Sequence, residues 1–279
     1  MPSRLRVSAV SYLNSVPLVW GFLHGRQQNL FDLRFDLPSE CADLLRAGQV
    51  DVGLVPSIQL AAQPDLLIIP GCSISSRGEV RSILLISRKP IEEIETVAAD
   101  TSSRSSVALA QIILARKYHR HVKIRPYPPR VPEMLDIADA ALIIGDPALR
   151  FDLMTSWPAG DAPPWIYDLG AEWTSWTRLP MVYAVWAVRR PAADLSLAAI
   201  FQDAAQFGLD RREEIAAAEA PRRDIGLESA RDYLFERIHY GWGEPENRGL
   251  SLFLEYAAGL GLAPRRSVLE TLDQPALAR

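Results

Sequence analysis

The sequence predicts a two-lobed α/β protein in which each lobe is a mainly parallel sheet flanked by helices and a ligand cleft lies between the lobes. Strand and helix patterns alternate along the first part of the chain and again in its middle, which is typical of parallel sheets with crossover helices. The stretches Asp51–Ser57 and Asp139–Asp146 look alike, because each is an acidic residue, a strand and a sharp polar stop. The length of 279 residues fits roughly two domains of ordinary size.

The N-terminal part of the chain switches between the strand period and the helix period. Apolar residues alternate with polar or small ones from Leu5 to Ala9, which indicates a strand. A helix follows, because Asn14 or Ser15 can cap its start and Gly25 can end it. The same reasoning predicts, in order, a strand at 5–9, a helix at 16–24, a strand at 31–35, a helix at 38–47 and a strand at 50–54.

The rest of the chain predicts a second lobe and a helical C-terminal part. Beyond Ala192 the residues Ala, Glu and Arg dominate, and these favour helices. Strands at 82–86 and 181–188 are expected to cross between the lobes, so the first lobe comprises residues 1–87 and 182–279 and the second lobe residues 88–181. The remaining elements are strands at 66–69, 97–99, 122–124 and 139–145 and helices at 107–114, 134–138, 195–207, 211–220, 227–239 and 250–260.

Composition and charge exclude several classes of protein. The net charge of −4 argues against a general nucleic-acid binder. The longest apolar run, Met181–Val188, is far too short to span a membrane. The N-terminus enters a strand without the apolar core of a secretory signal, and Cys41 and Cys72 make no disulfide framework, so we expect a cytoplasmic protein. Nothing indicates a metal or organic cofactor, since His119 and His121 lack further ligands at a convincing spacing.

The segment Asp100–Val107 is the sharpest local signal for a ligand. It places five hydroxyl side chains where a helix begins, and the unpaired amides of a helix N-terminus attract anions. The alternative is a well-capped helix without a ligand. The span from Thr101 to Pro132 has no acidic residue but seven basic ones, which either raises the local potential or forms a solvated basic face.

A second donor-rich segment, Ser73–Gly78, reads as a loop in which Arg77 could bind a carboxylate through two parallel hydrogen bonds. The alternative is a simple turn before the next strand. If both segments bind anions and face one cleft, the ligand is a dicarboxylate. Charge-assisted hydrogen bonds contribute about 1.5–3 kcal/mol each, so four or so could hold a small diacid.

Four further residues near the expected cleft each allow two interpretations. Asn14 either donates its amide to a ligand oxygen or caps the helix that follows it. Asp146 is either a base or a helix cap, and Pro147 favours the cap. Trp173 and Trp176 either line the cleft or pack between the lobes.

Several blocks of residues between residue 5 and about residue 190 together resemble one known family. They are Ser11-Tyr12-Leu13-Asn14, Gly53-Leu54-Val55-Pro56, Ser75-Ser76-Arg77-Gly78, Val80-Arg81-Ser82, Ser103-Arg104-Ser105-Ser106-Val107-Ala108, Ile144-Gly145-Asp146-Pro147-Ala148-Leu149, Asp168-Leu169-Gly170-Ala171-Glu172-Trp173 and Leu179-Pro180. In this order they resemble the chorismate dehydratase family of the futalosine route to menaquinone. The C-terminal helices are similar to that family only in character.

The resemblance implies a type II periplasmic-binding-protein fold and a hydro-lyase that removes water from chorismate to give 3-[(1-carboxyvinyl)oxy]benzoate without a cofactor. It favours Asn14 as the catalytic side chain nearest the reacting ring, while the base is either Asp146 or the substrate's own enolpyruvyl carboxylate. The expected substrate-binding residues are Ser103, Ser105, Ser106 and the Val107 amide at one carboxylate, Ser76 or Arg77 at the other, and Ser11, Tyr12, Ser57 and Gly145 elsewhere around the substrate.

Two alternatives stay open at this point. The sister enzyme, 1,4-dihydroxy-6-naphthoate synthase, resembles this chain in fold, but that family has a His-Glu pair where this chain has Gly145-Asp146. A non-catalytic solute-binding or sensor protein for a small dicarboxylate would need export or a DNA-binding segment, and the sequence predicts neither. The expected partner is therefore a small anionic substrate, and the sequence does not predict the oligomeric state.

Overall fold

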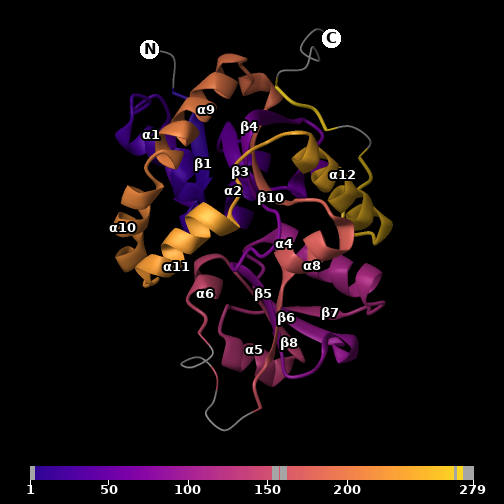
Figure 1. The fold of residues 1–279 in the computed structure, drawn as a ribbon. Helices are drawn as coiled ribbons and strands as arrows, with labels where there is room; N and C mark the ends of the chain where they lie inside the picture. Colours follow the sequence, from indigo (N-terminus) through magenta and orange to yellow (C-terminus); the bar gives the residue numbers. More distant parts are fainter. Residues whose placement is uncertain (1–3, 153–156, 158–161, 267–268, 273–279) are drawn as a thin grey trace.

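A computed structural model describes residues 4–152, 157, 162–266 and 269–272. It contains two mixed five-stranded sheets, each flanked by helices, and Figure 1 shows them as an upper and a lower lobe with both chain ends at the top. One buried apolar cluster extends from the first sheet into the second lobe, so the lobes are packed against each other and not merely linked. A smaller cluster fills the far side of the second sheet.

The two sheets have the same strand order, with one antiparallel strand at the same position in each. The first is β2 (Asp32–Asp36), β1 (Arg6–Val10), β3 (Val52–Pro56), β10 (Met181–Arg189) and β4 (Leu66–Ser76), with β10 antiparallel to its neighbours. The second is β7 (Lys123–Pro126), β6 (Thr96–Ala99), β8 (Ala140–Ile144), β5 (Ile83–Ser87) and β9 (Trp165–Asp168), with β5 antiparallel to its neighbours. The similar stretches at 51–57 and 139–146 thus form the third strand of each sheet.

Each sheet is completed by a strand that has just crossed from the other lobe. After β4 the chain enters the second sheet as β5, and after β9 it returns to the first sheet as β10. The predicted lobe boundary at residue 87 is therefore wrong, because Ile83–Ser87 pairs with β8 and β9 of the second sheet. A fully apolar strand shows that it is buried, but its sequence does not show in which sheet it lies.

The helices begin and end largely where capping residues predict. Pro17 lies in the first turn of α1 and Gly25 caps its end, while Glu40 accepts from the amide of Leu37 at 2.9 Å at the start of α2. The helices are α1 (Val16–His24), α2 (Pro38–Arg46), α3 (Gln59–Ala62), α4 (Arg104–Ile112), α5 (Val131–Ile137), α6 (Gly145–Leu149), α8 (Leu169–Thr177), α9 (Ser196–Leu209), α10 (Arg212–Arg222), α11 (Leu227–Asp232) and α12 (Glu244–Gly259), with π-helical turns at Ile113–Lys117 and Tyr233–Arg237.

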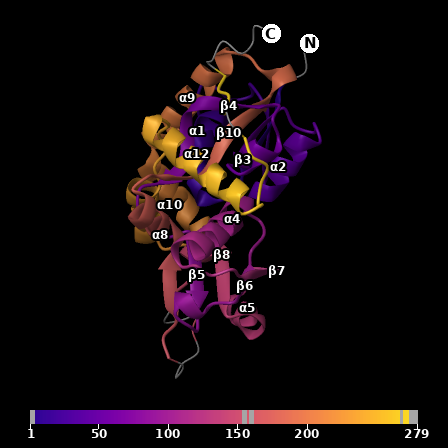
Figure 2. The same cartoon turned by 90° about the vertical axis from the view of Figure 1, so that its right-hand side faces the viewer.

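The C-terminal helices lie where the two lobes meet. Helices α10 and α11 lie beside the first lobe and reach down to α6 of the second (Figure 1), and α12 lies against α4 (Figure 2). The tryptophans of α8, a helix that the sequence did not predict, pack between these parts. Trp173 is fully buried, its indole nitrogen donates to the carbonyl of Pro180 at 3.2 Å, and its ring contacts Trp176 and Phe253. Of the two interpretations, interlobe packing is therefore confirmed.

Both cysteines are buried, and burial raises the pKa of Cys41 and of Cys72 to about 12, so neither is a reactive thiolate near neutral pH. Within the described residues, no helix has the length and apolar character needed to cross a lipid bilayer.

Candidate active site

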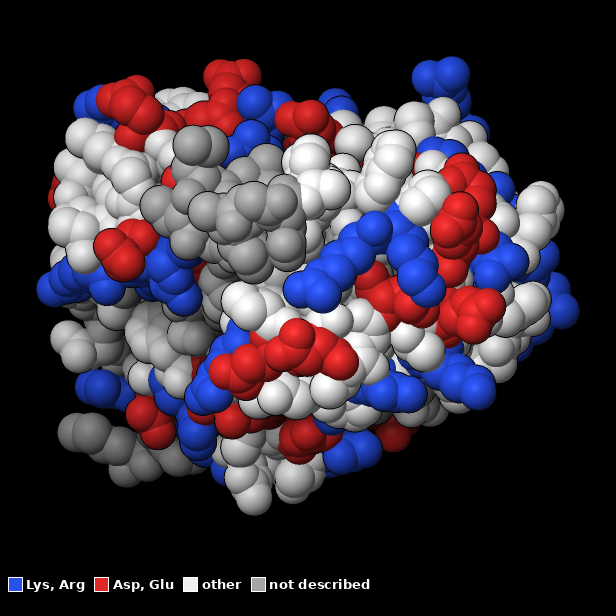
Figure 3. Space-filling view, turned by 90° about the horizontal axis from the view of Figure 1, so that it is seen from below, with Lys and Arg blue, Asp and Glu red and all other residues white. Residues whose placement is uncertain are grey.

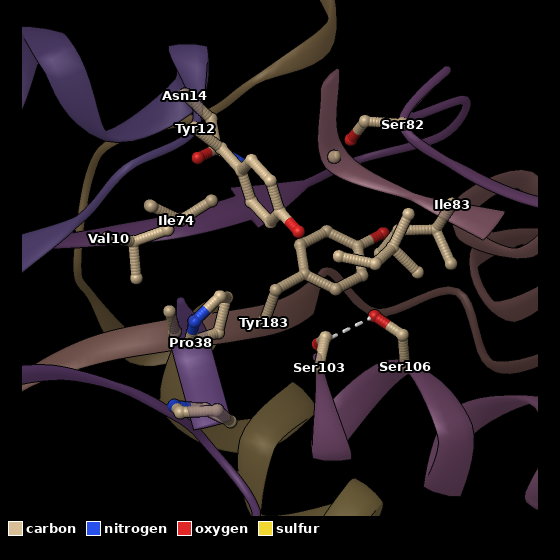
Figure 4. A pocket seen from close by; sticks show the side chains of 14 residues that line it. Val10, Tyr12, Asn14, Pro38, Ile74, Ser82, Ile83, Ser103, Ser106 and Tyr183 are labelled. Atoms are coloured by element: carbon tan, nitrogen blue, oxygen red, sulfur yellow. Dashed lines mark hydrogen bonds between the residues drawn. The ribbon is translucent and has the colours of Figure 1, made fainter. Parts of the chain in front are cut away.

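A pocket lies between the two lobes at the carboxyl ends of their central strands. Val10, Pro56 and Ile144 at its wall are the last residues of β1, β3 and β8. The space that no protein atom fills is about 450 Å³ when the open mouth of the pocket is included. This is the edge of an open α/β sheet at which ligands bind. Its polar side chains are Tyr12, Asn14, Ser82, Ser103, Ser106 and Tyr183 (Figure 4).

The side chain of Asn14 is held by a buried tyrosine from the C-terminal helices. Its Nδ2 donates to the Tyr233 hydroxyl at 3.1 Å, and that hydroxyl donates to Oγ of Ser82 at 2.8 Å. The carbonyl oxygen Oδ1 of Asn14 is buried and has no hydrogen-bond partner among the described residues. An unsatisfied buried acceptor costs about 1–3 kcal/mol, so a ligand that donates here gains that much in return.

Tyr12 and Gly145 face each other from opposite lobes, and the Tyr12 ring fits there only because residue 145 has no side chain. A Cβ atom at Gly145 would lie 2.7 Å from the Tyr12 ring, and Gly145 has a φ of +63°, which glycine adopts without strain. The Tyr12 hydroxyl is 3.0 Å from Oγ of Ser102. Burial raises the pKa of Tyr12 to about 12, so the phenol stays a neutral hydrogen-bond donor. The structure thus places two predicted site residues together in the pocket.

The first turn of α4 presents two hydroxyls to the pocket, as the sequence predicted. Ser103 and Ser106 line the pocket with their hydroxyls 3.0 Å apart, and Figure 4 shows both pointing from the helix toward the ring of Tyr183. The amides of Arg104, Ser105 and Ser106 form this turn and have no partner within the helix. Hydroxyls and free amides at a helix N-terminus bind a carboxylate or another anion.

Other residues of the same segment point away from the pocket. Oγ of Ser105 lies 3.2 Å from Oγ of Ser57 and accepts from the amide of Ile58 at 3.2 Å. These contacts join α4 to the loop after β3. The amide of Val107 donates to the carbonyl of Ser103 at 3.3 Å, so it is engaged in the helix. The structure thus separates Ser57, Ser105 and Val107 from the expected substrate-binding group.

Tyr183 enters the pocket because β10 carries a bulge, which the sequence analysis missed. Val182 pairs with Ser75 and Ala184 pairs with Ile74, so Tyr183 between them has no partner on β4. A bulge of this kind redirects a side chain, and here it turns the phenol inward. The Tyr183 hydroxyl is 2.8 Å from Oγ of Ser76, so Ser76 contacts the site through Tyr183. Burial raises the pKa of Tyr183 well above its ordinary value.

The segment Ser73–Gly78 is not the second anion-binding loop that the sequence predicted. It is mostly strand β4, and the hydroxyls of Ser73 and Ser75 donate to the carbonyls of Gly241 and His239. Arg77 is half exposed and is paired with Glu246, its Nη2 lying 2.8 Å from the carboxylate. The partners of these side chains lie more than 160 residues away in the sequence, so no local pattern could reveal them.

Asp146 lies beside the pocket and holds two other segments of the chain. Its Oδ1 accepts from the amide of Leu13 at 2.9 Å, and its Oδ2 accepts from Nη1 of Arg223 at 2.6 Å. The same Nη1 donates to the carbonyl of Ser11 at 2.7 Å. Both carboxylate oxygens are thus engaged, and Asp146 and Ser11 do not line the pocket. This geometry does not favour Asp146 as a base.

The basic residues of the acid-free span do not reach the pocket. Arg104 pairs with Asp43 at 2.8 Å and Lys117 pairs with Glu172 at 2.6 Å, so these charges are neutralised on the surface. Figure 3 shows basic and acidic side chains intermixed on the underside of the molecule, and not one basic face. Within the described residues, no three metal-ligating side chains come together. The described lining of the pocket holds no charged side chain, so its polarity comes from neutral hydroxyls and amides.

The fold is a two-lobed binding-protein architecture with a pocket between its lobes. The chain is similar to the periplasmic aliphatic sulphonate binding protein SsuA from Escherichia coli, with a TM-score of 0.64 and 16% identity over 95% of each chain. It is also similar to protein AF1704 from Archaeoglobus fulgidus, with a TM-score of 0.69 and 16% identity over 93% of this chain and 98% of that one. At these identities the two structures show the fold alone.

Within this architecture, the chain belongs to the menaquinone biosynthesis family, whose model matches residues 5–259. It is 30% identical to the chorismate dehydratase of Thermus thermophilus, with the match covering 91% of this chain and 94% of that protein. The fold and the family that the sequence predicted are therefore confirmed.

Proposed function

We propose that this protein is a chorismate dehydratase, a hydro-lyase that acts in menaquinone biosynthesis, and that it works in the cytoplasm as part of the futalosine route. The observation that carries the proposal is the pocket between the lobes of a menaquinone-biosynthesis family member, lined by neutral hydroxyl and amide groups. The relative from Thermus thermophilus supports the same substrate. Chorismate carries two carboxylates and one hydroxyl on a hydrocarbon ring, so a largely apolar pocket with a few neutral polar side chains and one unsatisfied acceptor suits it.

The reaction is the loss of water from a cyclohexadiene ring. The C–H bond at the ether-bearing carbon breaks, and its electrons delocalise toward the ring carboxylate as a dienolate. The C–O bond of the neighbouring hydroxyl then breaks, the new π bond completes the benzene ring, and the proton and hydroxide leave as water. Formation of the aromatic ring makes the reaction strongly favourable, so the protein chiefly orients the substrate. Orientation supplies about 7–11 kcal/mol in favourable cases.

The base in this proposal is the enolpyruvyl carboxylate of the substrate itself. The described pocket lining has no Asp, Glu, His or Lys, and Asp146 is engaged with Leu13 and Arg223. The substrate carboxylate is attached through the ether oxygen to the carbon that loses its proton, so it is within reach of that proton. It then returns the proton to the departing hydroxide.

In this proposal, residues of the two lobes bind different parts of the substrate. Ser103, Ser106 and the first-turn amides of α4 hold one carboxylate from the second lobe. Asn14 faces the ring hydroxyl, which donates to the unsatisfied Oδ1, and Tyr12 and Tyr183 contribute neutral phenols on the side of the first lobe. We place the lobe boundaries at the two crossings, residues 77–82 and 178–180, where the chain passes from one sheet to the other.

The test is to incubate the purified protein with chorismate and to follow the aromatic product by absorbance and mass spectrometry. The proposal expects stoichiometric conversion to 3-[(1-carboxyvinyl)oxy]benzoate, and a fall in kcat of at least 100-fold in Asn14→Ala, since losing one such polar group costs about 2.7–4 kcal/mol. Tight binding of chorismate without product would instead indicate a solute-binding or sensor protein. Near-normal turnover by Asn14→Ala would remove Asn14 from the mechanism.

A further inference from the structure

Arg223 is the residue that follows α10, and its guanidinium contacts the start of the turn that carries Tyr12. Nη1 donates to the carbonyl of Ser11 at 2.7 Å and to Oδ2 of Asp146 at 2.6 Å. Through Asp146 it also acts on Leu13, whose amide donates to Oδ1 of that carboxylate at 2.9 Å. The Arg223 and Asp146 side chains are only 18% and 10% exposed, so solvent screens this pair far less than a surface pair.

The contact joins parts of the chain that belong to different lobes. Asp146 lies in α6 at the end of β8 in the second sheet, whereas Ser11 and Leu13 follow β1 in the first. A second contact also joins the two lobes: Nη1 of Arg150 in the second lobe donates to the carbonyl of Arg223 at 2.9 Å. The end of α10 is thus held from the second lobe at two points.

Separation of the lobes would break these bonds together. Moving Asp146 away from the first lobe breaks its bonds to the Leu13 amide and to Arg223 and replaces them with bonds to water. In the closed arrangement this pair is largely shielded from solvent, so its attraction is stronger than that of an exposed pair. The closed arrangement therefore has a polar bond set that an open one lacks, and the same set fixes the turn on which Tyr12 and Asn14 reach the pocket.

We propose that Arg223 is a positioning residue, which holds the lobes closed through Asp146 and thereby keeps the Tyr12–Asn14 turn in its place beside the substrate. The effect on turnover rests on the proposed dehydratase function, while the effect on lobe closure does not. Arg223 and Asp146 act as one unit in this account, so losing either has the same consequence as losing both. A ligand must then close the lobes with its own binding energy, which lowers its apparent affinity.

The experiment compares Arg223→Met, Asp146→Asn and the double variant with wild type. The matched control is Arg222→Met. Glu219 pairs with Arg222 as well as with Arg223, but the Arg222 side chain is exposed and, among the described residues, has no hydrogen bond or ion pair to the second lobe. Small-angle scattering of the ligand-free proteins reports the radius of gyration, and steady-state kinetics with chorismate report KM and kcat. Arg223→Lys keeps the positive charge and most of the aliphatic chain of the side chain. It is measured as well, so that the proposal can still be tested if Arg223→Met does not fold.

The proposal expects a larger radius of gyration in both single variants but not in the control. It expects kcat/KM to fall about 10- to 100-fold in each, partial recovery in Arg223→Lys, and no further loss in the double variant, because groups that act as one unit are not additive. Multiplied losses in the double variant, an equal loss in Arg222→Met, or an unchanged radius in Arg223→Met would overturn it. Absence of turnover in the wild type would contradict the proposed function instead. The scattering result would still show whether Arg223 and Asp146 hold the lobes closed.

Discussion

The amide nitrogen of Asn14 donates a hydrogen bond of 3.1 Å to the hydroxyl of Tyr233, a fully buried residue that lies 219 positions further along the chain. That hydroxyl donates in turn to Ser82, so its orientation is fixed. Because Nδ2 of Asn14 is used in this way, Oδ1 is the atom left without a partner among the described residues. The C-terminal helices therefore determine which end of the Asn14 amide a substrate meets.

Replacing Tyr233 with Phe should impair both stability and turnover. It removes the acceptor of Asn14 and the donor of Ser82, so we expect a loss of about 1–3 kcal/mol in the free energy of unfolding. We also expect a fall in kcat of roughly tenfold, because the Asn14 amide is free to rotate. Tyr240→Phe is the control, since the Tyr240 hydroxyl is buried without a hydrogen-bond partner among the described residues. Thermal unfolding and kinetics check both variants, and equal behaviour of the two would contradict the role of Tyr233.

Replacing Gly145 with Ala should damage the pocket through Tyr12. The new Cβ would lie 2.7 Å from the Tyr12 ring, so the ring must move. Gly261 is a matched control, because its φ of +71° is close to the +63° of Gly145 and no described heavy atom lies within 4 Å of its Cβ position. Both variants should lose about 1 kcal/mol of stability from the backbone alone. Only Gly145→Ala should lower kcat/KM, and an unimpaired Gly145→Ala enzyme would show that the Tyr12 position is unimportant.

Replacing Ser103 or Ser106, which face the pocket, should weaken substrate binding, whereas replacing Ser105 should not. Loss of one charge-assisted hydrogen bond of about 1.5–3 kcal/mol predicts a rise in KM of roughly 10- to 100-fold for Ser103→Ala and Ser106→Ala. Ser105→Ala should leave KM within about twofold and reduce stability, because Oγ of Ser105 contacts Ser57 and Ile58. Calorimetric binding of chorismate together with kinetics separates these outcomes. A KM effect in Ser105→Ala alone would place the carboxylate elsewhere.

The pH dependence of kcat/KM should be flat over a wide range. Among the described pocket residues only Tyr12 and Tyr183 titrate, and burial raises the pKa of Tyr12 to about 12 and that of Tyr183 well above its ordinary value. For a tyrosine with a raised pKa, the neutral form and its stabilising contribution persist below the unfolded value of about 10 and are lost as the pH rises toward 12. The substrate carboxylates have pKa values of about 3–4.

We therefore expect no inflection in kcat/KM between about pH 5 and pH 10. Activity should fall on the acid side only as the substrate base becomes protonated. A measured pH–rate profile with an inflection near 6 or 7 would instead indicate a protein base such as a histidine or a buried carboxyl group.

The sequence was sufficient for the architecture because local patterns carry it. The stretches at 51–57 and 139–146 were predicted as equivalents, because each is an acidic residue, a strand and a polar stop, and their strands take the same place in both sheets. Helix starts at Pro38 and near Ser103 follow from capping residues, and the pocket follows from the rule that ligands bind at the carboxyl ends of strands. Tyr12, Asn14, Ser103, Ser106 and Gly145 were predicted site residues, and all five line the pocket.

What the sequence did not reveal depends on distant partners. Asp146 resembles a free acid or a helix cap locally, yet its cation is 77 residues away. Arg77 resembles an anion-binding arginine, yet Glu246 neutralises it from 169 residues away. Tyr183 points into the pocket only because β10 bulges against β4, and the register of two distant strands is not readable from either one.

A crystal structure of the Asn14→Ala protein with chorismate tests the central claim most directly. The account predicts the ring between the lobes, one carboxylate within hydrogen-bond distance of the hydroxyls of Ser103 and Ser106, and the enolpyruvyl carboxylate beside the C–H bond that breaks. Chorismate bound outside the interlobe pocket, or in it with a protein carboxylate, imidazole or amine against that C–H bond, would contradict the account.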